Sequence, residues 1–173
     1  MTNIENITAA DLVDNYGEAV YRLCRSLTPT KEDAEDLFQD TYVKALGQMP
    51  ERHENTRGLL FSTAIYLWKS RKRTFARRAR LAPVAHSDEL LTASSGFNIE
   101  SNLIAREEIR TLREEVAALP EKFRIPVILY YTVELSISDI ASTLSLPEGT
   151  VKSRLHKARK LIKEGLINNG YEQ

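Results

Sequence analysis

Hydrophobic residues recur every three or four positions along most of the chain, and this spacing predicts amphipathic helices. The segments concerned are residues 9–27, 30–47, 57–78 and 103–119, followed by an apolar run at 121–133. That run is apolar enough to be a buried strand, but its place between helices favours a buried helix. Pro126 within it is compatible with a helix only near the helix start or at a kink.

The same periodicity predicts which side chains face the interior. Along the chain these are Leu12, Val13, Tyr16, Val20, Leu23 and Leu27, then Ala34, Leu37, Phe38, Tyr42 or Thr41, Ala45 and Leu46, and then Leu103, Ile104, Ile109, Leu112, Val116 and Leu119. Thr30 is placed to cap the second helix, with acidic residues in the first turn that favour the helix dipole.

Residues 81–102 have no sustained period and contain a proline and a Ser-Ser-Gly cluster, which is typical of a linker. The segment is long for a loop inside one compact domain. We therefore expect an all-α fold of two small helical domains, residues 8–80 and 103–168, joined by a flexible linker over residues 81–102. A chain of 173 residues has room for two such domains.

Composition argues against several classes of protein. Cys24 is the only cysteine in the sequence, so neither an internal disulfide framework nor a multi-cysteine zinc site can form. No apolar run reaches about 18 residues and the first residues do not resemble a secretory signal, so we expect a protein of the reducing cytoplasm. Three scattered histidines and the lack of a phosphate-loop motif predict no enzyme activity, metal, cofactor or small-molecule substrate.

The net charge of zero conceals blocks of opposite charge. Acidic and basic residues number 9 and 4 in residues 1–50, 2 and 9 in 51–82, 7 and 3 in 83–120, and 6 and 8 in 121–173. Two basic blocks separated by an acidic one indicate two separate contacts with polyanions, although charge runs also form ordinary solvated helix faces.

Residues 136–163, SISDIASTLSLPEGTVKSRLHKARKLIK, have the pattern of a helix-turn-helix. Ser136 or Ser138 can cap the first helix, and a second helix opens near Pro147. Its inner face carries Val151, Leu155, Ala158 and Ile162. The basic outer face suits a recognition helix in the major groove, although a plain helical hairpin could also have one. The candidate DNA contacts are Thr150, Lys152, Ser153, Arg154, His156, Lys157, Arg159 and Lys160.

A second basic segment, KSRKRTFARRAR at residues 69–80, holds seven bases and no acid. Tyr66 and Trp68 precede it on the same predicted helix. Aromatic rings and cations together suit nucleic acid with unstacked bases, because rings stack on bases while cations bind the backbone. For Trp68 a core position is equally compatible with the sequence, since large aromatic residues are usually buried.

These segments resemble the bacterial extracytoplasmic-function (ECF) sigma factors, two-domain initiation factors of RNA polymerase. Residues 119–166 resemble their region 4, EDAEDLFQDTYVKAL resembles region 2.2, and RGLLFSTAIYLWKSRKR resembles regions 2.3 and 2.4. The resemblance implies promoter-specific initiation, with region 4 on the −35 duplex and the N-terminal domain on the −10 single strand. The implied partners are core RNA polymerase (its β′ coiled coil and β flap), promoter DNA and an anti-sigma factor, which in this family is often membrane-bound.

The resemblance also implies roles for single residues. Those implied to grip the β′ coiled coil are Asp33, Glu35, Asp36, Leu37, Gln39, Asp40, Thr41 and Lys44. Those implied to capture a flipped base of the −10 element and hold its strand are Glu51, Arg52, His53, Glu54, Asn55, Arg57, Tyr66, Trp68, Lys69, Arg71, Lys72 and Arg73. Leu37 is also expected in the domain core.

Three positions depart from the family pattern. Many relatives carry Asn in place of Tyr66 and Asp or Asn in place of Ser70, so the contacts to the −10 element differ here. Relatives often have Gly in place of Glu134, and we expect Glu134 to occupy this turn without a positive φ.

A self-sufficient helix-turn-helix regulator is the main alternative function, with residues 1–80 as a ligand or dimerisation domain. Such a regulator binds duplex DNA without polymerase, usually as a dimer on a two-fold site. We would not expect an acidic helix followed by an aromatic and basic helix in a ligand-binding domain. Charge would also allow residues 69–78 to lie on a membrane surface, but their aromatic content is modest.

Overall fold

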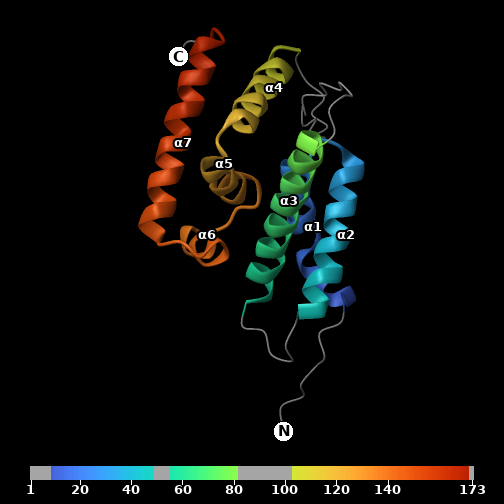
Figure 1. The fold of residues 1–173 in the computed structure, drawn as a ribbon. Coiled ribbons are helices and arrows are strands. Elements are labelled where there is room, and N and C mark those ends of the chain that lie inside the picture. The colour runs from blue at the N-terminus through green and yellow to red at the C-terminus, as the bar shows by residue number, and fades with distance from the viewer. Residues whose placement is uncertain (1–8, 49–54, 82–102, 172–173) are drawn as a thin grey trace. The chain divides into compact units, whose positions relative to one another are not determined.

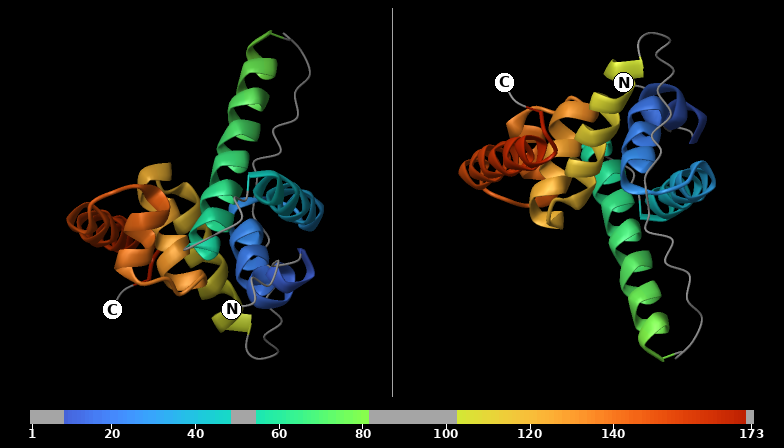
Figure 2. Two further views of the ribbon diagram at one scale, coloured as in Figure 1. Left: turned by 90° about the horizontal axis from the view of Figure 1, so that it is seen from below. Right: turned by 90° about the horizontal axis from the view of Figure 1, so that it is seen from above.

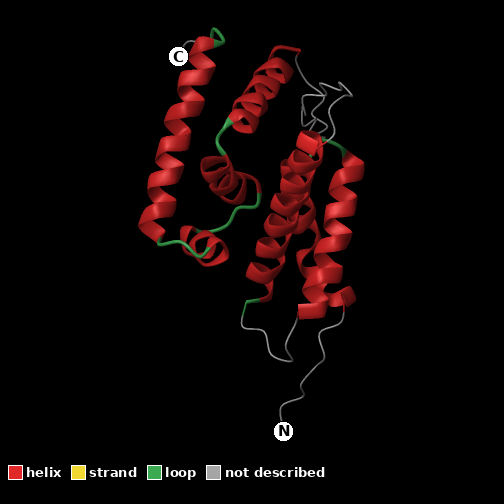
Figure 3. Ribbon diagram, in the orientation of Figure 1, coloured by secondary structure: helices red, strands yellow, loops and turns green. Residues whose placement is uncertain are grey.

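The computed structural model describes residues 9–48, 55–81 and 103–171. The chain divides into two compact units, Met1–Asp88 and Glu89–Gln173. The boundary falls within the predicted linker, of which residues 82–102 lie outside the described residues. All regular elements in the described ranges are helices (Figure 1 and Figure 3), so the predicted all-α fold is confirmed.

The N-terminal unit is a bundle of α1 (Ala9–Leu27), α2 (Lys31–Gln48) and α3 (Thr56–Leu81), in which each helix packs against the other two (Figure 1). Thr30 caps α2 as predicted, because its Oγ1 accepts a hydrogen bond from the Asp33 amide at 3.0 Å. The core side chains include Val20, Leu23, Cys24, Ala34, Leu37, Ala45, Leu60, Phe61 and Ala64.

The inward stripe of this unit differs from the prediction at two positions, Val13 and Leu46, whose side chains are exposed. Thr41 and Tyr42, between which the periodicity did not decide, are both buried. Each hydroxyl donates a hydrogen bond to a backbone carbonyl, Thr41 to that of Leu37 at 2.6 Å and Tyr42 to that of Leu12 at 3.3 Å. These two hydroxyls therefore lie in the core with a hydrogen bond satisfied.

The C-terminal unit contains α4 (Leu103–Ala118), α5 (Glu121–Val127), a π-helical turn η1 (Ile128–Thr132), α6 (Ile137–Leu144) and α7 (Glu148–Asn168). The apolar run is helical, with Pro126 one residue before the end of α5. Its helix continues directly into η1, where the Val133 amide donates to the carbonyl of Ile128 at 3.1 Å. Pro126 thus lies within the helix, where α5 passes into the π-helical turn.

The predicted inward stripe of α4 fails at one described position, Leu112. Leu112 is exposed, whereas its neighbour Thr111 is buried and its hydroxyl lies 3.2 Å from the Tyr171 hydroxyl. Because α4 packs against α7, Tyr171, just beyond the end of α7, contributes a polar partner that periodicity within α4 cannot reveal.

The expectation for Glu134 is wrong: this residue has φ 61°, in the left-handed region. The chain leaves η1 and reverses before α6, and the Leu135 amide donates back to the carbonyl of Leu129 at 2.9 Å. A side chain in this region costs about 1–2 kcal/mol relative to glycine, which explains why glycine suits the position.

Candidate nucleic-acid interface

Local hydrogen bonds cap both ends of α6, the first helix of the helix-turn-helix in the C-terminal unit. Ser136 is the N-cap of α6, since its Oγ accepts from the Asp139 amide at 3.0 Å. At the other end Ser145 has φ 53°, and the Leu146 amide donates to the carbonyl of Ala141 at 2.9 Å. This left-handed residue ends α6 and lets α7 begin three residues later, at Glu148.

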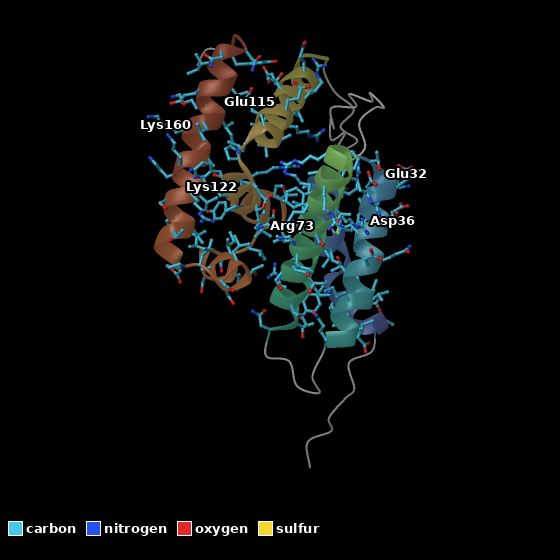
Figure 4. The ribbon with its side chains drawn as sticks, in the orientation of Figure 1. Glu32, Asp36, Arg73, Glu115, Lys122 and Lys160 are labelled. Carbon is cyan, nitrogen blue, oxygen red and sulfur yellow. The ribbon has the colours of Figure 1, made fainter. Side chains whose placement is uncertain are left out.

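Helix α7 separates an apolar face from a basic face. Val151, Leu155 and Ala158 are buried and Ile162 is half-buried, as the spacing predicted. The predicted −35 residues that are exposed are Lys152, Ser153, His156, Lys157, Arg159 and Lys160, while Thr150 and Arg154 are half-buried. Figure 4 shows Lys160 extending from α7 away from the body of its unit. The structure thus brings all eight residues together along one helix.

The basic face of α7 carries weak internal ion pairs. Lys152 lies 3.9 Å from Glu148, and Lys160 lies 3.8 Å from Glu164, with all four side chains largely exposed. Exposed pairs of this kind contribute about 0–1 kcal/mol, so a phosphate can replace the glutamate at little cost.

The predicted −10 residues at the start of α3 are partly outside the described residues, which include none of 51–54. Asn55 is described, and its Oδ1 accepts a hydrogen bond from the Gly58 amide at 2.8 Å, which caps α3. The Arg57 guanidinium lies 5.7 Å from the centre of the Phe61 ring. Both residues therefore have a structural role at the helix start.

Trp68 does not occupy the position that base stacking requires. Its side chain is only 6% exposed, because this part of α3 packs against both α1 and α2. Its ring is contacted by Lys72, whose Nζ lies 4.9 Å from the ring centre. The core alternative is therefore correct for Trp68. Tyr66 is 52% exposed, with the Lys44 Nζ 5.0 Å from its ring centre.

Helix α2 presents an acidic face to solvent. Among the predicted polymerase contacts, Asp33, Glu35, Asp36, Gln39 and Asp40 are exposed and Lys44 is half-buried. Figure 4 shows Glu32 and Asp36 pointing outward from α2. Leu37 is fully buried, which confirms its expected place in the core, and Thr41 is fully buried as well, so both side chains hold the helix in the bundle.

Two contacts between α2 and α3 join the predicted polymerase face to the predicted DNA face. An Arg71 Nη nitrogen donates to Asp40 Oδ2 at 2.6 Å, and Lys44 covers the Tyr66 ring. Residues 40 and 71 are 31 positions apart, so no local sequence pattern indicated that they meet. We call this pair of contacts the α2–α3 seam.

Sequence reasoning also missed Phe75, which is 75% exposed. The signal was present, because this ring lies inside the basic segment 69–80. Within the described ranges, no helix combines the length and hydropathy needed to cross a bilayer, and no group of three metal-ligating side chains is found.

Comparison with known proteins matches each unit to a part of one family. The family model for sigma-70 region 2 matches residues 12–78, and that for sigma-70 region 4 matches residues 109–162. The ECF RNA polymerase sigma factor SigW of Bacillus subtilis is 28% identical over 168 residues, which cover 91% of this chain and 88% of SigW. SigM of the same organism is 27% identical over 165 residues, covering 95% of this chain and 98% of SigM.

Two solved structures share the fold. One is the sigma factor RpoE in complex with the anti-sigma factor NepR from Bartonella quintana, with TM-score 0.66, 23% identity, and coverage of 90% of this chain and 96% of that one. The other is CnrH in complex with the cytosolic domain of CnrY, with TM-score 0.63, 21% identity, and coverage of 92% and 88%.

Proposed function

The chain belongs to the ECF group of sigma-70 factors, and we propose that it binds core RNA polymerase and directs initiation at a specific set of promoters. Members of this family are transcription initiation factors rather than catalysts. The observation that carries the proposal is the pairing, in one chain, of a helix-turn-helix with a basic exposed face and a bundle with adjacent acidic and basic helices.

For the −35 element, we propose that α7 enters the major groove of duplex DNA. Arg154 and His156 lie in the N-terminal half of α7, the part of a recognition helix that reaches base edges. Lys157, Arg159 and Lys160 lie further along and supply phosphate contacts, which carry most of the salt-dependent affinity.

For the −10 element, the proposed site is the loop before α3 together with the exposed side of α3. Residues 51–55 supply polar groups for a flipped base, and Lys69, Arg71, Lys72 and Arg73 bind the strand. Strand capture by these groups supplies the free energy of melting together with polymerase contacts, so the mechanism requires no nucleotide hydrolysis.

The proposed contact with the polymerase β′ coiled coil is the exposed face of α2. Asp36, Gln39 and Asp40 lie on successive turns of one side of this helix and are exposed. Leu37 contributes indirectly, because its burial fixes α2 in the bundle.

Control by an anti-sigma factor completes the proposal. The two solved structures named above are complexes, one with the anti-sigma factor NepR and the other with the cytosolic domain of CnrY. Both units expose charged helix faces that a folded partner can cover, and covering α2 would block polymerase binding.

The test is transcription in vitro with purified core polymerase on a library of upstream fragments. We expect discrete start sites that depend on the added chain, and their alignment gives both promoter elements. Arg154→Ala and His156→Ala should change the preferred −35 sequence, whereas Lys122→Ala, an exposed cation of the same unit on α5, should not. Tight binding to duplex DNA without polymerase, and no transcripts with it, would instead favour a self-sufficient regulator.

A further inference from the structure

Phe75 has the largest exposed fraction among the large hydrophobic side chains that the structure describes, 75%. Burying a phenylalanine side chain stabilises a fold, and here about three quarters of this residue is left in contact with water. The last turns of α3 extend beyond α1 and α2 (Figure 2), so the bundle offers no surface on which this ring could pack.

Trp68 provides the comparison within the same helix. Residues seven positions apart lie on nearly the same side of a helix, so Trp68 and Phe75 share one direction on α3. Trp68 is 6% exposed in a helix that packs against α1 and α2, whereas Phe75, seven residues nearer the end of that helix, is 75% exposed. The exposure of Phe75 therefore follows from where the bundle ends.

The surroundings of the ring are cationic. Arg71 and Lys72 lie one turn before Phe75 and Arg78 lies one turn after it, all on the same side of α3. The segment 69–80 contains seven bases and no acid. In the chain alone, Arg71 donates to Asp40 of α2 at 2.6 Å.

An exposed ring with cations on both sides fits one class of binding partner better than the others. A folded protein partner would require acidic groups to match seven bases, and a membrane surface would favour several apolar residues on this face. A single DNA strand supplies both features at once, because each nucleotide has a planar base and a phosphate. A duplex does not, because its bases are already stacked.

We propose that Phe75 is the ring on which an unpaired base of the promoter strand stacks, with Arg71, Lys72 and Arg78 binding the flanking phosphates. This inference rests on the proposed function, and it assigns to Phe75 the stacking role that the sequence suggested for Trp68. Since stacking on an aromatic side chain is worth about 1–3 kcal/mol per base, and about 1.4 kcal/mol is tenfold, losing the ring should weaken strand capture roughly 5- to 140-fold.

The test uses holoenzyme assembled from core polymerase and the full chain, on a promoter that the wild-type chain is first shown to open. Phe75→Ala removes the ring, Phe75→Leu keeps apolar bulk without a ring, and Phe75→Trp keeps a ring. Permanganate reactivity of unpaired thymines measures opening, and competition for core polymerase measures binding to it. Because Phe75 is exposed, all three variants should unfold at the wild-type temperature.

We expect Phe75→Ala and Phe75→Leu to reduce opening roughly 5- to 140-fold, Phe75→Trp to retain it, and all three to bind core polymerase as the wild type does. A premelted promoter bubble should show the same order of affinities. Equal opening by all variants would overturn the proposal, and so would Phe75→Leu opening like the wild type, because bulk rather than stacking would then suffice. Loss of core binding would assign the ring to a protein interface. If the wild-type chain opens no promoter, the proposed function itself fails.

Discussion

The ion pair between Asp40 of α2 and Arg71 of α3 leads to a prediction with a definite sign. The Asp40 carboxylate lies 2.6 Å from an Arg71 nitrogen, where it occupies a position that a strand phosphate would take. In the chain without polymerase, the carboxylate and the strand therefore compete for Arg71. Asp40→Asn keeps the side-chain shape and removes the competing charge, so we expect tighter binding of single-stranded DNA.

The size of the effect follows from the exposure of the pair. The Arg71 and Asp40 side chains are 39% and 60% exposed, so water and salt screen their attraction. Exposed pairs contribute about 0.2–1 kcal/mol, and about 1.4 kcal/mol is a factor of ten. Removing the competitor should therefore raise affinity for the strand by about 1.4- to 5-fold at low salt, and less at high salt.

Fluorescence anisotropy of a labelled single-stranded oligonucleotide, titrated with the full chain, measures this affinity. Glu35→Gln is the matched control, because it removes one negative charge from α2 but breaks a pair within that helix, with Lys31 at 3.5 Å. The increase should also disappear in an Arg71→Ala background. If Asp40→Asn binds the strand more weakly than Glu35→Gln, the carboxylate orients Arg71 for the strand and the competition reasoning is refuted.

Three further predictions concern stability. Glu134→Gly should stabilise the C-terminal unit by about 1 kcal/mol in urea unfolding, because it relieves the positive φ; an unchanged or lower midpoint would contradict this. Leu37→Ala should destabilise the N-terminal unit by about 2–5 kcal/mol, since Leu37 is fully buried, while Asp36→Ala should change it little; similar losses would show that the assignment of the two faces of α2 is wrong. Burial raises the pKa of the Cys24 thiol from 9.0 to about 12, so the folded chain keeps the proton that the unfolded chain loses above pH 9. Stability should fall as pH rises from 9 towards 12, and Cys24→Ala should flatten that part of the curve.

Helices and their caps were predictable because both depend on residues close in sequence. The stripe from Leu12 to Leu27 sets the buried face of α1. Thr30 and Ser136 each cap a helix, because their hydroxyl oxygen accepts a hydrogen bond from the amide three residues later. The basic face of α7 was predictable for the same reason, because the spacing of its apolar residues and the positions of its charges are both read within one helix.

The positions that the sequence did not predict depend on contacts across the fold. Trp68 and Phe75 have the same helical direction and the same aromatic character, and only the extent of α1 and α2 decides that one is buried and the other exposed. Arg71 meets Asp40 because α2 packs on α3, and nothing near either residue indicates the other. Glu134 has a positive φ because the chain reverses direction within a few residues after the π-helical turn.

The packing of α2 on α3 places the acidic face of α2, proposed to bind polymerase, beside the basic segment of α3, proposed to bind the strand. Unpairing and unstacking a base costs a few kcal/mol, and one stacking ring returns about 1–3 kcal/mol. Phe75 therefore cannot open a promoter without further contacts, and phosphate binding and the hold on polymerase must supply the rest. If polymerase contacts Asp40 as proposed, these contributions would be linked, because occupying this carboxylate would release Arg71 for the strand. Binding of core polymerase would then increase strand capture at the step where it is needed, with the coupling limited to the few-fold that an exposed ion pair can provide.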